Sequence, residues 1–187
     1  MDLRLDRVGL LLDQLATSVE FSQARFAGLT DEEFLWEPAQ PSWSLRRREE
    51  AVTGRPVGSG DWVLDHDRDA DPAPVSTIAW RLSHLVDMYA GRWEWTFGER
   101  RTDPGVLVEF SPSAQTTLGM LWEQTDRWMK DVPTLTDEQL DVPGYGQYPR
   151  GLDPQLPFAG ILWWMNREFI HHAAEVALLR DLYRRRV

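Results

Sequence analysis

The stretch FAGILWWMNREFIHHAAEVALLRDLY, Phe158–Tyr183, decides the fold of this chain. With about 100° of rotation per residue, four apolar side chains fall on one stripe of a helix, namely Ile161, Met165, Val176 and Leu179. A helix with such a stripe buries it against other helices. The stretch therefore predicts the last helix of a helical core.

Two ionisable residues lie inside this apolar stripe. Glu168 and His172 are four residues apart, so their side chains project from the same face of the predicted helix. Burying such groups without partners costs several kcal/mol. The pattern therefore predicts that Glu168 and His172 share an ion-pair partner or a metal ion inside the protein.

Three further segments carry helical periodicity. They cover residues 5–26, about 77–97, and a stretch that begins near Ser111-Pro112. The segment 38–75 is rich in proline and glycine and has little periodicity, so it predicts a long loop. Trp43 and Trp62 suggest that parts of this loop pack back on the helices.

Two short segments of the chain are almost identical. LTDEEF at Leu29–Phe34 and LTDEQL at Leu135–Leu140 each follow a long predicted helix, and Thr30 with Glu33 predicts a capping box. This repeat indicates that the chain consists of two helical hairpins with the same arrangement of elements. We therefore expect one all-α domain over 1–187, a four-helix bundle of the up-down-down-up type with a long loop at 38–75 between the first two helices.

Composition restricts the function. Hydrophobic residues make up 42% of the 187 residues, as in a folded protein, and the net charge of -10 argues against nucleic acid as a partner. Without cysteine, a metal would need His, Asp or Glu ligands. The N-terminus lacks the apolar core of a signal peptide, and no segment reaches the ~20 apolar residues of a membrane span. We expect a cytoplasmic protein without membrane contact, and a homodimer through an exposed helix face is compatible with a bundle of this size.

His84 is the third candidate ligand. It lies among apolar residues of the second predicted helix, and with Glu168 and His172 it offers two imidazoles and a carboxylate to a Zn, Ni or Fe type ion. Two other interpretations remain open. A buried His can be a core residue whose ring nitrogens have ordinary hydrogen-bond partners, and Glu168 with His172 can be a pair on the surface of a helix. Four residues are the candidate lining of an apolar pocket over the site: Trp80, Met88, Trp95 and Met165.

Three motifs carry a resemblance to a known family. They are TIAWRLSHL at Thr77–Leu85, EFIHHAAE at Glu168–Glu175 and LRDLY at Leu179–Tyr183. With the Leu-Thr-Asp-Glu echoes and Trp43-Ser44, they resemble the DinB-like superfamily of four-helix metalloproteins over nearly the whole chain.

The resemblance implies a divalent metal held by one His on the second helix and a His-x-x-x-His pair on the last. His84 matches the first ligand and His172 the last, whereas Glu168 stands where the family has His. This replacement gives a set of two His and one carboxylate, which changes metal affinity and preference. Related thiol transferases and maleylpyruvate isomerases use the metal to activate a low-molecular-weight thiol such as mycothiol or bacillithiol.

Two functions follow as hypotheses. The first is a metal-dependent enzyme that activates such a thiol, or water, for S-transfer to a small-molecule substrate or for its hydrolysis. The alternative is a non-catalytic helical bundle that binds a small molecule in a Trp-lined pocket. In either case we expect Glu175 to orient a metal-ligating His and His171 to be peripheral.

Overall fold

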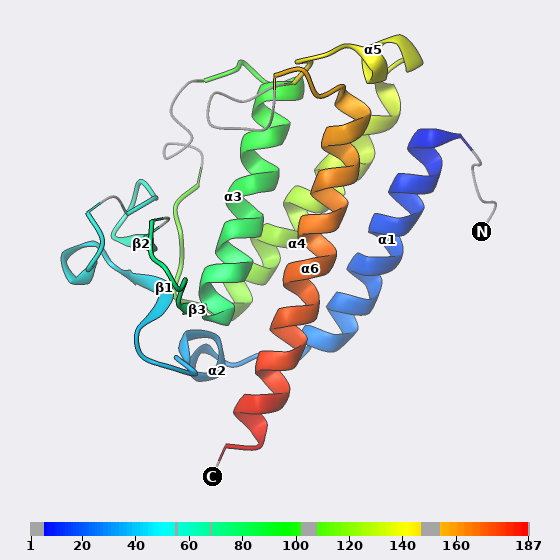
Figure 1. The fold of residues 1–187 in the computed structure, drawn as a ribbon. Coiled ribbons are helices and arrows are strands. Elements are labelled where there is room, and N and C mark those ends of the chain that lie inside the picture. The colour runs from blue at the N-terminus through cyan, green and yellow to red at the C-terminus, as the bar shows by residue number, and fades with distance from the viewer. Residues whose placement is uncertain (1–5, 55, 68, 102–107, 147–153, 187) are drawn as a thin grey trace.

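The computed structural model describes residues 6–54, 56–67, 69–101, 108–146 and 154–186, and it is mostly helical (Figure 1). The α-helices in these ranges are α1 (Arg7–Phe26), α2 (Asp31–Leu35), α3 (Ile78–Phe97), α4 (Ala114–Asp131), α5 (Asp137–Asp141) and α6 (Phe158–Arg184). Short 3-10 turns occupy Arg48–Glu50 and Val132–Thr134. The four long helices agree with the periodic segments of the sequence.

The four long helices pack side by side. Both α3 and α1 contact α4 and α6, and Figure 1 shows α1 and α6 running toward one end of the molecule while α3 and α4 run toward the other. The stripe of α6 that decided the fold is buried throughout. The aromatic side chains of the shared core that are completely buried are Phe26, Phe34, Tyr89, Trp128, Phe158 and Phe169.

Side-chain caps define where the helices begin. Thr77 accepts a hydrogen bond from the backbone N–H of Trp80 and so begins α3, and Asp6, Thr30, Ser113 and Thr136 cap α1, α2, α4 and α5 in the same way. Such a cap satisfies a backbone N–H that has no partner within the helix. Because Ser113 is the cap, α4 begins later than predicted, and Pro112 lies outside it.

The two echoed segments differ in the structure. At Thr136 the capping box is complete, because Gln139 also accepts from the backbone N–H of Thr136. At Thr30 only half of the predicted box forms, since the carboxylate of Glu33 pairs with Arg180 of α6 instead. The local sequence predicts that the Glu33 side chain caps α2, but the buried guanidinium of Arg180 binds it instead.

The helical fold is confirmed only in its coarse form, because the segment 38–75, predicted to be a long loop, contains strands. This segment forms a three-stranded sheet of order β2-β1-β3 from β1 (Ser42–Arg47), β2 (Trp62–Asp65) and β3 (Val75–Ser76). β1 is antiparallel to β2 and parallel to β3, and the sheet packs on α3. Strands this short have too little periodicity to be recognised in the sequence, and their buried residues join the core by packing on α3.

Asp65 holds the sheet's connecting segment in place. Its buried carboxylate accepts hydrogen bonds from the backbone N–H groups of Val52 and Thr53 and from the Thr53 hydroxyl, and Arg46 is nearby. Burial alone would raise the pKa of Asp65, but these hydrogen bonds and Arg46 outweigh burial and lower the pKa below its ordinary value. The carboxylate therefore stabilises this segment in its ionised form.

Candidate metal centre

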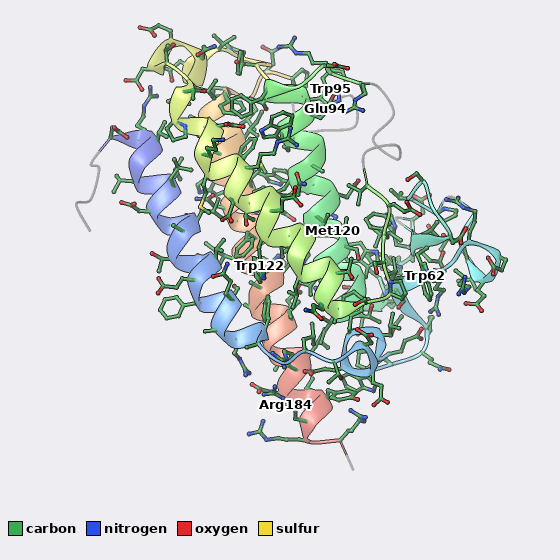
Figure 2. The ribbon with its side chains drawn as sticks, turned by 180° about the vertical axis from the view of Figure 1, so that it is seen from behind. Trp62, Glu94, Trp95, Met120, Trp122 and Arg184 are labelled. Atoms are coloured by element: carbon green, nitrogen blue, oxygen red, sulfur yellow. The ribbon has the colours of Figure 1, made fainter. Side chains whose placement is uncertain are left out.

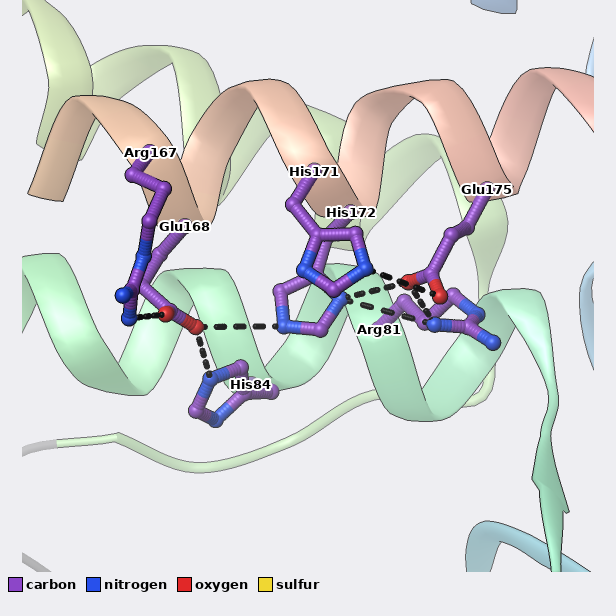
Figure 3. Close-up of polar contacts among 7 residues, drawn as sticks. All are labelled: Arg81, His84, Arg167, Glu168, His171, His172 and Glu175. Atoms are coloured by element: carbon purple, nitrogen blue, oxygen red, sulfur yellow. Dashed lines mark hydrogen bonds and ion pairs between the residues drawn. The ribbon is translucent and has the colours of Figure 1, made fainter. Parts of the chain in front are cut away.

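Two helices bring the three predicted ligands together. Figure 3 shows His84 of α3 facing Glu168 and His172 of α6, and one ligand atom from each residue lies within 4.8 Å of the others. Oε2 of Glu168 is 3.5 Å from Nε2 of His172 and 3.9 Å from Nε2 of His84. The three side chains are mostly buried, with exposed fractions between 11% and 29%.

The sequence builds this juxtaposition from local geometry. On α6, residues 168 and 172 are one helical turn apart and share the face that packs on α3. His84 lies in the first half of α3, a helix buried on nearly all sides. The two helices therefore hold the three groups on rigid backbone.

The spacing of the donors fits a metal ion. Zinc binds imidazole nitrogen and carboxylate oxygen at about 2.0–2.2 Å, which places neighbouring ligands of a tetrahedral site roughly 3.4 Å apart. The two distances measured from Glu168 are close to that value. His84, Glu168 and His172 could thus hold a metal ion.

The protonation states also fit. The neighbouring imidazoles of His172 and His84 hold the pKa of Glu168 well below its usual range, and Arg167 contributes at 2.7 Å, although burial opposes the shift. Burial lowers the pKa of His172, despite the neighbouring Glu168. At neutral pH this gives a carboxylate and an uncharged imidazole, the forms in which these groups bind metals.

Glu175 lies where the sequence analysis expects a residue that orients His172. Its Oε2 is 2.9 Å from Nδ1 of His172 and contacts the guanidinium of Arg81. An ionised carboxylate only accepts hydrogen bonds, so the short contact between Glu175 and His172 places the imidazole proton on Nδ1. Nε2, which faces Glu168 and His84, is left with its lone pair.

The sequence analysis missed Arg81. This side chain is mostly buried, and burial lowers its pKa to about 10, which still leaves it charged at neutral pH. Its position three residues before His84 on a helix with little exposed surface was the available signal. His171 is 62% exposed and lies outside the three-residue group, although its Nε2 is 3.3 Å from Glu175.

An aromatic wall borders the centre. The ring of Trp80 stacks on His84 with centroids 5.1 Å apart and meets His172 edge-on. Trp43 of β1 packs on Trp80 at 5.6 Å, as its position in a segment that packs back on the helices suggested. Both tryptophans and His84 line a pocket of about 260 Å³.

The four predicted pocket residues do not gather around this pocket, and among them only Trp80 lines it. Met88 and Met165 are buried in the core of the helices. Trp95 lies with Glu94 near the end of α3 remote from the sheet that carries Trp62 (Figure 2), and its indole N–H donates to the backbone oxygen of Arg101. Periodicity identified these residues as inward-facing, but it does not tell how far along the helix a cavity lies.

The comparisons with known proteins identify the family. A family model described as the DinB superfamily matches residues 14–176, which include all three candidate ligands, and this confirms the resemblance seen in the sequence. No curated protein and no solved structure gave a significant match. Within the described ranges, none of the helices has the length and apolar character that crossing a membrane requires.

Proposed function

The chain belongs to the DinB superfamily, and on that premise we propose that it is a metal-dependent enzyme whose ion is held by His84, Glu168 and His172. The substrate is a small molecule, and the reaction is S-transfer, in which a low-molecular-weight thiol is joined to the substrate through its sulfur atom, or hydrolysis by water. The proposal includes the up-down-down-up order of the four long helices and a cytoplasmic location.

The contacts of His172 carry the metal proposal. A neutral imidazole has a single N–H group. In His172, a carboxylate oxygen of Glu175 lies 2.9 Å from Nδ1 and one of Glu168 lies 3.5 Å from Nε2. With the hydrogen toward Glu175, the Nε2 lone pair faces the negative oxygen of Glu168, an arrangement that a cation between them stabilises. A second proton on His172 would serve the same purpose, but burial acts against it.

The donor set restricts the ion. Two imidazole nitrogens and one carboxylate oxygen suit Zn, Ni or Fe better than Mg or Ca, which prefer oxygen ligands throughout. Such an ion, when bound, lowers the pKa of a coordinated thiol or water and so supplies a nucleophile near neutral pH.

The surrounding residues have separate tasks. Glu175 keeps the ring of His172 in one orientation, and Arg81 pairs with Glu175 and holds its carboxylate in place. Trp80 covers one face of His84 and limits the access of water to that side of the centre. The family resemblance favours a thiol such as mycothiol or bacillithiol as the co-substrate.

A binding protein without catalysis is the second candidate. The observation that favours it is the pocket between Trp43 and Trp80, which can hold a ligand whether or not a metal is present. The two candidates differ in one measurable property: the enzyme needs the metal for its function, and the binding protein retains ligand affinity without it.

The test is elemental analysis of untagged protein purified without chelator. We expect about one equivalent of Zn, Ni or Fe in the wild type and none in His84→Ala or His172→Ala. His171→Ala is the matched control, because it removes the neighbouring imidazole outside the group and should keep the metal.

Circular dichroism must show the same helical content in all four proteins. Stoichiometric metal in both His84→Ala and His172→Ala would refute the site. Wild-type protein that takes up no metal even after reconstitution would favour the binding protein. Metal-loaded protein would then be assayed with thiols and small electrophiles.

A further inference from the structure

The long helices differ in what their exposed faces carry. Large apolar side chains are exposed on α6 and on the neighbouring α1, namely Leu10, Phe21, Trp163, Ile170, Leu178 and Leu182. The positions that α4 exposes are polar or glycine, namely Gln115, Thr116, Gly119, Glu123, Asp126, Arg127 and Lys130. A helix face in contact with water is normally polar, and a contiguous apolar face marks an interaction surface. The apolar surface of α1 and α6, which we call the α1–α6 face, is therefore a candidate contact with another molecule.

The exposed side chains of the two helices form one surface, because α1 and α6 pack side by side and run in the same direction (Figure 1). The amide of Asn166 donates to a backbone oxygen in the first half of α1, and Arg25 at the other end of α1 donates to the backbone oxygen of Ala177. These contacts set the register of the two helices. Phe21 lies one turn before Arg25, and Ala174 lies one turn before Ala177, so both lie at the same level.

The exposed residues of α6 are arranged symmetrically around Ala174. Ile170 and Leu178 lie four residues before and after it, and Arg167 and Asp181, which are about half exposed, lie seven residues before and after it. At about 100° per residue, all of them project within about 40° of the direction of Ala174. In an antiparallel pair of α6 helices centred there, Ile170 lies level with the partner's Leu178, and Arg167 with the partner's Asp181. The face is thus complementary to itself, as a twofold-symmetric interface requires.

The charges of this face favour a second copy over a lipid surface. Helices that lie on membranes carry unpaired Lys and Arg around their apolar side. Here Arg25 and Arg167 each pair with a carboxylate, and the chain has a net charge of -10, so anionic lipid repels it. A second copy instead supplies an arginine and an aspartate that match those of the first.

The exposed area sets the expected affinity. Phe21 is 73% and Trp163 is 56% exposed. At 150–250 Å² for a whole aromatic side chain, these two residues offer roughly 200–300 Å² of apolar surface, to which Leu10, Ile170 and Leu178 add. A stable interface takes about 800 Å² from each partner, which this face approaches only with its polar rim. We therefore expect a reversible association with a dissociation constant on the order of 10 μM.

We propose that the α1–α6 face binds the same face of a second copy of this chain in a twofold-symmetric dimer. The two α6 helices pack antiparallel with the symmetry axis at Ala174, whose small side chain lets the backbones approach, and the two Phe21 rings meet beside the axis. Glu168 and His172 project from the opposite side of α6, toward α3. The dimer therefore forms with or without a metal, and the inference does not rest on the proposed function.

Sedimentation velocity over concentrations up to about 200 μM tests the dimer, on wild type as purified and after treatment with chelator. We expect a monomer–dimer equilibrium in both samples. Phe21→Glu and Ala174→Arg each place two like charges at the axis and should weaken the dimer about tenfold or more. Val52→Glu is the matched control, because Val52 is an exposed apolar residue of the sheet segment, outside the face. Circular dichroism must show the same helical content in all variants.

Charge reversal tests the antiparallel register. Arg167→Asp and Asp181→Arg each oppose two like charges across the interface and should weaken the dimer about fivefold. The combined variant should return to within about twofold of wild type. Combining the two changes does not restore the pairs with Glu168 and Arg25 within one chain, so recovery reports a contact between copies.

Cross-linking locates the axis. The chain has no cysteine, so Ala174→Cys introduces a single thiol. Two such thiols lie close together at a twofold axis, and mild oxidation should give a disulfide-linked dimer. Gly119→Cys on the exposed face of α4 is the matched control and should stay largely monomeric under the same conditions.

The outcomes separate this inference from the proposed function. Wild type that stays monomeric throughout would overturn the dimer, and a dimer unaffected by Phe21→Glu and Ala174→Arg would overturn its face. No recovery in the combined charge variant would overturn the register. A monomer that binds vesicles of phosphatidylserine and phosphatidylcholine through Phe21 would assign the face to a membrane instead. A dimer that never holds metal refutes only the metal-dependent enzyme, and a monomer with stoichiometric metal refutes only the dimer.

Discussion

Two clusters of charged side chains on α6 are both largely buried, yet they differ in how completely their charges are matched. Arg180 and Glu33 are at most 4% exposed, and the guanidinium donates to both carboxylate oxygens and to the backbone oxygens of Arg25 and Ala27. In the cluster around His172, two carboxylates flank one imidazole. Glu175 is matched by Arg81, but the cation beside Glu168 is Arg167, which is half exposed, so the charges of this cluster are less completely matched and we call it unbalanced. The Arg180–Glu33 cluster, which we call closed because all its charges are paired inside the protein, stabilises the fold. The unbalanced cluster lies next to a pocket, where a ligand or an ion can bind and complete it.

The largest expected effect concerns the closed cluster. Arg180→Ala leaves the Glu33 carboxylate buried without its counter-charge, so we expect the free energy of unfolding to fall by about 3–5 kcal/mol. Urea denaturation followed by circular dichroism measures this. Arg25→Ala is the control, because Arg25 pairs with Asp181 at the surface and should cost no more than about 1 kcal/mol. Similar losses in both variants would show that the buried cluster stabilises the fold no more than an ion pair with Asp181 does.

The second prediction concerns Glu175, which belongs to the unbalanced cluster. Glu175→Gln keeps the size of the side chain but weakens its hold on the His172 proton, so we expect a 10–100-fold loss of zinc affinity. Competition with a chromophoric chelator measures it. The free energy of unfolding of the metal-free variant should fall by about 1–3 kcal/mol, because the mostly buried Arg81 loses its charged partner but can still donate to the amide oxygen. Unchanged zinc affinity would show that Glu175 does not orient the ligand.

Asp65 offers a third, smaller effect, which depends on pH. Its pKa is lower in the folded than in the unfolded protein, so its contribution is complete above the unfolded pKa of about 3.9 and is lost as the pH falls through the folded pKa. We expect Asp65→Asn to cost about 2 kcal/mol at pH 7. The difference between wild type and variant should shrink steadily in urea denaturation below about pH 4. A constant difference between pH 7 and pH 3 would exclude this role of the ionised carboxylate.

The smallest effect is expected at the surface pair of Arg7 and Asp141. The two residues contact at 2.6 Å but are half or more exposed, so Arg7→Ala should leave the free energy of unfolding almost unchanged. Thermal unfolding at low and high salt measures it. A larger loss would mean that matched charge stabilises this protein even in contact with water, which would weaken the distinction drawn from Arg180.

Much of the fold was predictable because it depends on long amphipathic helices. The segments 5–26, 77–97 and 158–183 carry enough turns for their apolar period to be clear, and the structure places helices there. The small sheet was not predictable, since its strands span two to six residues and their partners are set by contact with α3. Glu33 shows the same limit, because its pairing with Arg180 overrides the local capping pattern.

The sequence by itself determined that the chain is mostly helical, that it belongs to one family, and that Glu168 and His172 share a helix face, because these properties depend on neighbours along one helix. Only the tertiary structure decided that His84 meets them, that Arg81 joins Glu175 beside His172, and that a sheet segment completes the pocket next to Trp80. These contacts join residues far apart in the chain. Their distances depend on how the helices pack, which no local period encodes.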